Sequence, residues 1–375
     1  MRYTLSEKIG HILRVIIAWF GAYLFLGFIR FYGMISPEVA TQSIWSSAPR
    51  VYISQILLAS IITGILYGLV DIILDRPRYQ RASFWRLILT RGSLHFVIIL
   101  ITLSAVVLSR VRFDFMLPDD VPATLGGLIR SHSFQVFAVY FLVVSSLMNT
   151  YQQVNQKFGR GVLLDMMRGK FHKPQEAVRI FMFIDLKSSV RIAEELGHLR
   201  YSALLQDCYF DLNTQLDRYK ARIYQYVGDQ VVLHWTPENG LMDNNCLRFF
   251  FAFIERMESR GAHYVNRYGF QPYFKAAAHI GRVTIAEVGV LKRSIAFHGD
   301  TVNTTSRLHD QCNSYSQRLL VSKDLLSRLP DESKLKIVYL GDEVLKGKYR
   351  KMEIYGVKGI IEETNTSSAK VGRTP

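Results

Sequence analysis

The sequence contains little cysteine, and its acidic residues are fewer than its basic ones. The three cysteines, Cys208, Cys246 and Cys312, are widely separated and match no zinc-ligand spacing. A cysteine count that is small and uneven in number argues against a framework of disulfide bonds. It is typical of a protein in a reducing compartment. The 46 basic residues outnumber 31 acidic ones, which gives a formal net charge of +15. Such a balance suits either nucleic acid or an anionic membrane surface as a partner.

Hydrophobic residues make up 49% of the chain, which is high for a purely soluble protein, and they are concentrated before residue 150. The apolar segments there are Ile12–Ile29, Val51–Leu74, Leu87–Leu108 and Phe134–Met148. Each is close to the ~20 residues that a helix needs to cross a bilayer. We therefore predict a transmembrane domain of four helices over residues 1–150. The alternative is a large soluble fold in which these segments are buried core helices.

The charges between these segments favour the membrane interpretation and set an orientation. The loop from Asp75 to Arg91 and the stretch after the fourth segment are rich in arginine and lysine, whereas the other two loops are balanced or mildly acidic. The positive-inside rule then predicts a multi-pass protein of the cell (inner) membrane, in contact with membrane lipid, with both termini in the cytoplasm. This topology accounts for most of the basic charge, and the chain has no nucleic-acid reader motif, so we expect no nucleic-acid partner.

The rest of the chain is polar enough to be a separate domain. Residues 151–176 are polar and compatible with a helix, and we interpret them as a helical connector. Residues 177–361 alternate between strand-like and helix-like patterns. Residues 362–375 are small and polar, so we expect a disordered tail.

The soluble domain is predicted to be an α+β fold with helices over one face of a sheet. Val178–Leu186 is a compact strand, and Ile192 opens an apolar pattern of helical spacing that continues to about Tyr219. A hairpin turning at Gly228 and Asp229 follows. A second helix is expected over Asn244–Arg267, then two strands in "PYFKAAAHIG" and "VTIAEVG", a third helix from Gly299, and further short strands to the end.

Two aspartates stand at strand ends in this arrangement. Asp185 ends the first strand, and Asp229 stands at the hairpin tip. Taken alone, Asp229 is more simply interpreted as an ordinary turn former. If the two strands are neighbours, however, the carboxylates lie close together and repel each other unless cations stand between them. Two magnesium ions would satisfy such a pair, because Mg²⁺ prefers one or two carboxylates together with substrate phosphates.

The third predicted helix contributes another pair of polar side chains. Asn303 and Arg307 are spaced i, i+4 and so share one helix face. An amide and a planar guanidinium suit a charged, oxygen-rich ligand. An unrelated, solvated helix face is the simpler interpretation of the spacing alone.

Four segments in the right order resemble the class III adenylate/guanylate cyclase family, membrane-anchored bacterial type. They are "FMFIDLKSS", "YQYVGDQVV", "FHGDTVNTTSR" and "LKGKYRKMEIYGV", and the likeness extends over about Arg179–Val357. The resemblance implies a catalytic domain with a ferredoxin-like βαββαβ core. It also implies conversion of ATP to 3′,5′-cyclic AMP and pyrophosphate.

The resemblance implies a role for each matching residue. Asp185 and Asp229 match the metal-binding aspartates for two magnesium ions, for which manganese can substitute, and Asn303 and Arg307 match the catalytic pair beside the ribose and α-phosphate. The implied substrate-binding positions are the Leu186 carbonyl, the amides of Lys187, Ser188 and Ser189, the base-facing Gln225 and Ala296, and Lys346, in preference to Lys348, for the terminal phosphates. In this family one domain supplies the aspartates and its partner supplies the Asn/Arg pair, so we expect a homodimer.

The base-facing positions depart from both patterns of the family. Gln225 replaces the lysine that is usual in adenylate cyclases, and Ala296 replaces Asp or Thr; guanylate cyclases carry Glu and Cys there. Val190 also replaces the usual Thr of the first motif. We favour ATP, with a guanylate cyclase and a catalytically silent receptor that keeps the fold as alternatives. A cyclic-dinucleotide synthase is disfavoured, because "VGDQ" stands in place of its characteristic hairpin tip.

Overall fold

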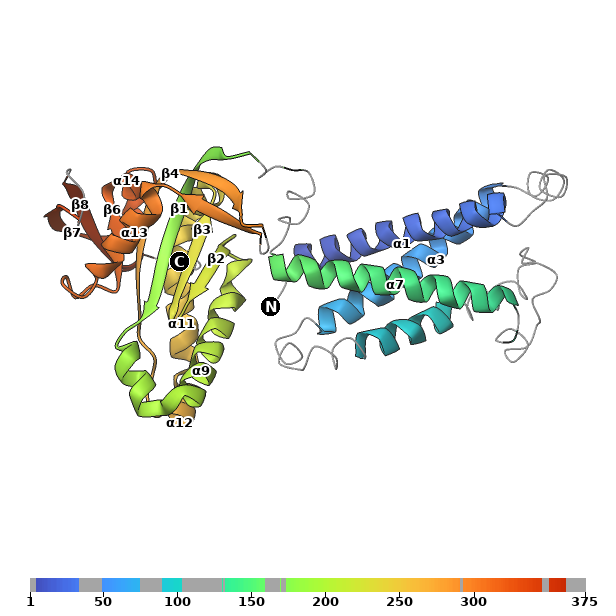
Figure 1. Ribbon diagram of the computed structural model, residues 1–375, viewed down its shortest axis with the longest axis horizontal. Coiled ribbons are helices and arrows are strands. Elements are labelled where there is room, and N and C mark those ends of the chain that lie inside the picture. Colours follow the sequence, from blue (N-terminus) through green and yellow to red (C-terminus); the bar gives the residue numbers. More distant parts are fainter. Residues whose placement is uncertain are drawn as a thin grey trace, which may run out of the picture. The chain divides into compact units, whose positions relative to one another are not determined.

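The computed structural model describes residues 5–33, 49–74, 90–102, 130, 132–158, 169, 173–290, 293–345 and 351–361. The chain divides into two compact units, Met1–Lys157 and Phe158–Pro375 (Figure 1). Each unit has its own hydrophobic core. The two are therefore described separately.

Helices make up the described part of the N-terminal unit. They are α1 (Leu5–Gly33), α3 (Pro49–Leu74), the helix Thr90–Thr102 and α7 (His132–Phe158). Gly64 and Gly68 let α3 approach α1 closely, since a Cβ on Gly64 would lie 2.6 Å from Cγ1 of Ile16. This small-xxx-small spacing is a common packing device between membrane helices. Trp19, Tyr67 and Phe141 form the centre of the unit's core.

The four predicted spans fall on helices wherever the structure describes them, and residues 87–89 and 103–108 of the third lie outside the described ranges. Two stretches, Lys8–Phe28 and Ile56–Leu74, are long and apolar enough to cross a membrane, and the helix Thr90–Thr102 is apolar but shorter. The predicted fourth span falls on α7, whose last turns, from Asn149 onward, are rich in polar side chains. Two candidate spans are thus found among the described residues, and the four-helix transmembrane region stays a prediction.

The second unit is built on a sheet of eight described strands. The order is β2-β3-β1-β4-β6-β8-β7, and β5 pairs with β4. Their bounds are β1 Gln175–Leu186, β2 Arg222–Val227, β3 Gln230–Trp235, β4 Phe274–Val288, β5 Ser294–His298, β6 Leu319–Ser322, β7 Leu335–Glu343 and β8 Met352–Ile360. Neighbouring strands are antiparallel except for β4 and β6. The partial order β2-β3-β1-β4 is the arrangement that the expected βαββαβ core produces.

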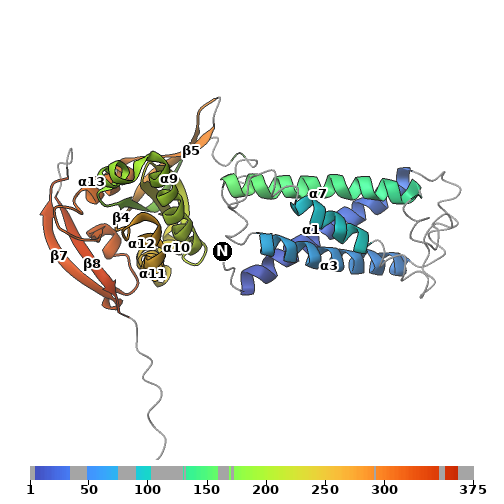
Figure 2. The same cartoon turned by 90° about the horizontal axis from the view of Figure 1, so that it is seen from below.

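Helices cover both faces of this sheet (Figure 2). They are α9 (Ser189–Leu216), α10 (Pro237–Leu241), α11 (Asn245–Ser259), α12 (Gly261–Tyr268), α13 (Asp300–Asp310) and α14 (Lys323–Leu326), with short 3₁₀ turns at Met242–Asn244 and Glu332–Lys334. Alternate residues of β1 serve the two faces, as the pleat requires. Ile180, Met182 and Ile184 pack with α9 and α11, whereas Phe181 and Phe183 pack with β5 and α13. Two buried faces explain why the β1 run is continuously apolar.

Some predicted elements were wrong in detail. The single helix expected over Asn244–Arg267 is α11 and α12, which are separated at Arg260. The two strands expected in residues 272–289 are one long strand, β4, and β5 was not predicted. Gly281 suggested a break in β4. It instead allows α13 to approach, because a Cβ there would clash with the Thr301 side chain.

Two predicted boundaries involve residues outside the described ranges. Helix α7 continues to Phe158 and β1 begins at Gln175, but most of the predicted connector between them is not described. The predicted tail, 362–375, lies wholly outside the described residues.

Candidate functional site

The strand register brings the two predicted aspartates together. Asp185 is paired with Gln230 of β3 on one side and with Lys275 of β4 on the other. Asp229 directly precedes Gln230 in the two-residue turn between β2 and β3, where Gly228 has a φ of 60°. Glycine with positive φ at the first turn position is the signature of a type II′ hairpin. The two carboxyl groups lie within hydrogen-bonding reach of each other.

The electrostatics of this pair are those of a cation site. Burial, followed by the hydrogen bond and negative charge of Asp229, raises the pKa of Asp185 to about 7. The positive charge of Lys275 acts in the opposite direction, with its Nζ 3.7 Å from Oδ2 of Asp185. Among the described residues, no group of three or more His, Cys, Asp or Glu side chains is arranged to hold a metal ion. A metal here would rest on these two carboxylates together with oxygens of a substrate, which is the coordination that suits Mg²⁺.

Metal binding at Asp185 is expected to depend on pH. A carboxyl must lose its proton to bind a metal, so the affinity for Mn²⁺ should fall about tenfold per pH unit below about pH 7 and change little above it. The direction of this pH dependence follows from the raised pKa of Asp185. Without metal, the folded protein favours the neutral acid at this residue, and the metal binds only after the carboxyl group has lost its proton. Titration of the full chain with Mn²⁺, followed by electron paramagnetic resonance, measures this. An Asp324→Asn variant, which alters an exposed carboxylate elsewhere, should keep the same profile. An affinity independent of pH between about pH 5 and pH 8 would contradict this assignment.

Lys275 is a site residue that the sequence interpretation missed. It stands in the apolar run "FKAAAHIG", only 12% of its side chain is exposed, and its Nζ also approaches Oδ1 of Asn313 at 3.4 Å. The signal that could have identified it is a lysine within a buried, alanine-rich strand. Only the pairing register of β4 with β1 shows that this lysine faces Asp185. Its ammonium group offers positive charge to an anion held at the same carboxylates.

The turn between β1 and α9 presents backbone donors beside Asp185. Leu186 is buried, whereas Lys187 and Ser188 are exposed. The Lys187 amide donates to the Tyr273 carbonyl at 2.8 Å, and Ser188 has a φ of 60° immediately before α9 begins. No acidic side chain occupies the first turn of α9. A helix N-terminus without its own carboxylate cap suits a phosphate group.

Two tyrosines, one on α9 and one on β2, hold the hairpin that carries Asp229 against α9. The Tyr209 hydroxyl donates to the Gly228 carbonyl at 2.9 Å, and the Tyr209 ring lies 4.7 Å from that of Tyr226. The Tyr226 hydroxyl in turn donates to Oδ1 of Asn213 at 2.9 Å. These contacts fix the hairpin tip relative to α9, and no local sequence signal pointed to them.

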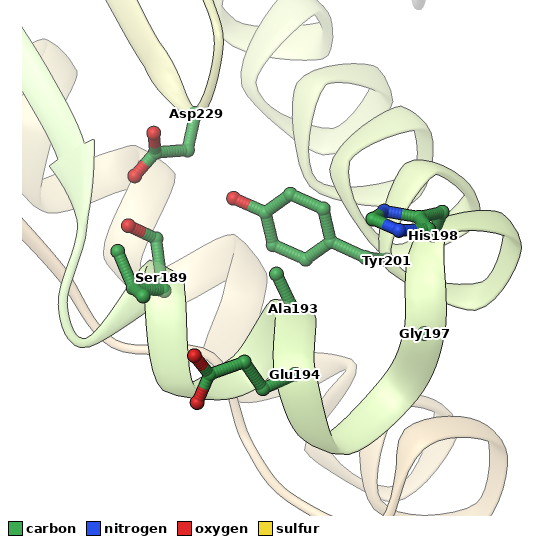
Figure 3. A pocket seen from close by; sticks show the side chains of 8 residues that line it. Ser189, Ala193, Glu194, Gly197, His198, Tyr201 and Asp229 are labelled. Carbon is green, nitrogen blue, oxygen red and sulfur yellow. The ribbon is translucent and has the colours of Figure 1, made fainter.

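A cavity of ≈ 440 Å³ opens beside Asp229. Its lining comes from the first half of α9 and the hairpin tip, namely Ser189, Val190, Ala193, Glu194, Gly197, His198, Tyr201 and Asp229 (Figure 3). Gly197, with a φ of 70°, bends α9 around the cavity. The Tyr201 hydroxyl points toward Asp229 and Ser189. The cavity therefore continues from Asp229 along α9.

The predicted catalytic pair lies on a different helix. Asn303 is exposed and Arg307 is half-buried on α13, whereas Thr304, Thr305 and Leu308 turn into the fold. The predicted shared face is therefore the outward face of the helix. Among the described residues, neither Asn303 nor Arg307 hydrogen-bonds or ion-pairs with Asp185 or Asp229. Within one copy of the chain, no hydrogen bond or ion pair among the described residues therefore joins the Asn/Arg pair to the two aspartates.

The remaining predicted residues are placed as follows. Gln225 is exposed on the edge strand β2, at a bulge in its pairing with β3. Ala296 is half-buried on β5, opposite Ala286 of β4. Ring contact between Tyr224 and Phe297, with centroids 4.9 Å apart, brings these two strands together. Lys346 and Lys348 lie outside the described residues.

Comparison with known proteins gives consistent matches. The family described as adenylate and guanylate cyclase catalytic domain matches residues 171–359. "Adenylate cyclase 2" of Rhizobium meliloti (strain 1021) is 35% identical over 216 residues, which are 58% of this chain and 60% of that protein. "Adenylate cyclase 1" of the same organism is 26% identical over 269 residues, covering 68% of this chain and 38% of that protein. The matched part thus spans less than two thirds of either relative.

A solved structure supports the fold. The structure of a bacterial light-regulated adenylyl cyclase superposes with a TM-score of 0.52 at 16% identity, over 64% of this chain and 69% of that one. At this identity the likeness concerns the fold alone.

Proposed function

The chain belongs to the adenylate and guanylate cyclase catalytic domain family, and from this premise we propose that it is a membrane-bound adenylate cyclase. In this proposal it converts ATP to 3′,5′-cyclic AMP and pyrophosphate. The observation that carries the proposal is the carboxylate pair Asp185 and Asp229 at adjoining strand ends, with Lys275 beside it. The curated relatives named above are adenylate cyclases, which favours ATP over GTP.

The residues at this pair fit two magnesium ions, with manganese as a substitute. Burial, followed by the neighbouring Asp229 carboxylate, raises the pKa of Asp185, and bound cations would offset both effects. Asp185, Asp229 and the Leu186 carbonyl would hold the ions. When bound, the ions supply positive charge to the phosphates and lower the pKa of the attacking hydroxyl.

The chain's own groups would position the triphosphate and stabilise its charge. The backbone amides of Ser188 and Ser189, at the start of α9, would donate to phosphate oxygens, whereas the predicted Lys187 amide already donates to the Tyr273 carbonyl. Lys275 would exchange its ion pair with Asp185 for a phosphate oxygen, and Lys346 would hold the terminal phosphates. Arg307 would oppose the charge that grows on the α-phosphate, and Asn303 would orient the ribose, so that its 3′-oxygen attacks in line.

The proposed active site is shared between two copies of the chain. Asn303 and Arg307 face outward and make no contact with the carboxylate pair among the described residues, so a second copy would supply them. A homodimer with two-fold symmetry would then contain two equivalent sites, each with the aspartates of one copy and the Asn/Arg pair of the other.

Gln225 and Ala296 are the positions that we propose meet the purine base. Gln225 carries both a donor and an acceptor, and Ala296 offers only its backbone, so neither side chain excludes a purine. The nearness of β2 and β5 places both positions in one region, where they would meet the base.

We also propose the chain's organisation. Residues 1–150 would be a multi-pass domain in the cell membrane, in contact with lipid, with both termini in the cytoplasm. Residues 151–176 would connect it to the catalytic domain, 177–361, and 362–375 would be a tail. Two candidate spans and the many exposed hydrophobic side chains of α1 and α3 support the membrane assignment.

A nucleotide assay on the full chain in lipid vesicles tests the proposed function. With magnesium or manganese, ATP should give cyclic AMP, and GTP should give at least about tenfold less cyclic GMP, a discrimination of about 1.4 kcal/mol. Cyclic GMP as the main product would overturn the choice of base. Neither product, from a chain that binds Mn²⁺ normally, would favour a silent receptor that retains the cyclase fold.

A further inference from the structure

All four described helices of the N-terminal unit approach one buried carboxylate. Asp71 of α3 is 1% exposed. Its Oδ2 lies 3.4 Å from Nε2 of His11 on α1 and accepts a hydrogen bond of 2.9 Å from Gln152 on α7. Its Oδ1 lies 3.9 Å from Nε2 of His95 on the helix Thr90–Thr102. Burying a carboxylate costs free energy. An ionisable residue at such a position is therefore usually there because it has a function.

His95 is held between this carboxylate and α7. Its ring is fully buried and stacks on Tyr67, with centroids 3.4 Å apart. Its Nδ1 lies 3.2 Å from Nδ2 of Asn149 and 3.4 Å from Oγ of Ser145, both on α7. Because an amide NH₂ and a hydroxyl can donate, Nδ1 acts as the acceptor, and the ring proton is on Nε2, facing Asp71.

The contact between His95 and Asp71 is incomplete as it stands. Nε2 of His95 and Oδ1 of Asp71 are buried and make no hydrogen bond among the described residues, and 3.9 Å is too long for a direct one. A purely structural bridge would normally satisfy both atoms. The geometry instead suits an ion pair that forms when a proton is added.

The charges around Asp71 allow such a proton. The negative charge of Asp71 favours a proton on His95, whereas Arg91, one turn before His95 and 2% exposed, opposes it. Among the described residues, Tyr67 on α3 is a further titratable side chain near Asp71, and Tyr23 on α1 lies near Tyr67. The His11 side chain is 19% exposed and so provides a route for a proton from outside the unit. No described group of three or more His, Cys, Asp or Glu can hold a metal ion, so a proton fits better than a metal.

Adding a proton changes which helix holds His95. A protonated imidazole donates from both nitrogens, so Nδ1 can no longer accept from the Asn149 amide, whereas the Ser145 hydroxyl can turn to accept. At the same time the positive ring is attracted to Asp71. Protonation therefore weakens a contact with α7 and strengthens one with α3. Helix α7 is the element from which the chain continues into the second unit, which begins at Phe158.

We propose that His11, Asp71 and His95 form a proton-binding regulatory site, and that its occupancy changes how firmly α7 is held and thereby the activity of the catalytic unit. The activity readout rests on the proposed cyclase function. The binding of the proton and its effect on α7 do not.

The test compares pH responses of full-length variants in lipid vesicles. Cyclic AMP formation is measured at about pH 6 and about pH 8, on either side of the ordinary histidine pKa. For each protein the activity at about pH 6 is divided by the activity at about pH 8. The wild-type ratio should differ by about fivefold or more from the ratio in His95→Gln and in Asp71→Asn. A fivefold effect is at the lower end of typical allosteric coupling. Thr102→Val is the matched control, because Thr102 is buried on the same helix as His95 but bonds Thr63 and its own backbone. It should keep the wild-type ratio.

Hydrogen exchange of α7 provides a readout that does not depend on catalysis. Between Ser145 and Phe158, wild-type amides should exchange faster than those of His95→Gln at about pH 6 and alike at about pH 8. Comparison at equal pH removes the intrinsic effect of pH on exchange. Equal activity ratios in wild type and both variants, or equal exchange at both pH values, would overturn the proposal. If no form makes cyclic AMP, the proposed function fails, and the exchange measurement alone decides on the proton site.

Discussion

Asp229→Asn is expected to reduce cyclic AMP formation by about a hundred- to a thousandfold. Asparagine has the same shape and suits the turn after Gly228, so the hairpin between β2 and β3 should keep its register. What is lost is one negative charge of the pair that would hold the metal ions. The assay is the initial rate with ATP and magnesium, followed by a titration with Mn²⁺.

The controls separate loss of the metal site from loss of the fold. Asp324→Asn removes an exposed carboxylate in the first turn of α14, far along the chain from the site, and should leave both rate and metal affinity unchanged. If Asp229→Asn keeps more than about a tenth of the activity, Asp229 is only a turn former, and the metal would have to rest on Asp185 without it.

The nearness of Asp185 and Asp229 could be predicted because it depends on local patterns. Asp185 ends a strongly apolar strand, and Asp229 stands in the turn that joins two others. The βαββαβ order then makes β1 and β3 antiparallel neighbours. The order of elements in the chain, the hairpin turn and the helical face of Asn303 and Arg307 are likewise properties of short segments. These are the features that hydrophobic periodicity and turn chemistry determine.

The parts that could not be predicted depend on contacts between distant segments. Lys275 faces Asp185 only because β4 pairs with β1 in one particular register. Gly281 gives no local sign that Thr301 approaches it, so β4 was divided into two strands. In the N-terminal unit, His95 stands in the apolar segment Leu87–Leu108, which gives no local sign of a charged partner. That Asp71, His11 and Gln152 converge near it is visible only once the helices are packed.

Arg307→Ala is the second change with a large expected effect, again about a hundred- to a thousandfold in rate. The side chain lies on the outward face of α13, and its removal leaves the buried residues Thr304, Thr305 and Leu308 in place. Metal affinity at Asp185 and Asp229 should therefore be unchanged, in contrast to Asp229→Asn. Arg307→Lys is expected to restore little activity, because an ammonium group cannot reproduce the planar fork of the guanidinium. Arg328→Ala, at another exposed arginine, is the matched control and should be fully active.

Mixing the two inactive variants, Asp229→Asn and Arg307→Ala, is expected to recover activity that neither has alone. In a symmetric dimer, random exchange of copies makes half of the dimers mixed, and each mixed dimer has one intact site and one doubly altered site. The mixture should then reach about a quarter of the wild-type rate. Recovery requires exchange of copies, so the two chains are made together in one membrane, and each alone is the control. Absence of recovery, with both chains present and metal binding intact in Arg307→Ala, would mean that a single copy brings Arg307 to its own carboxylates. In that case the Arg307 side chain would have to move toward Asp185 and Asp229, because no hydrogen bond or ion pair joins it to either aspartate among the described residues.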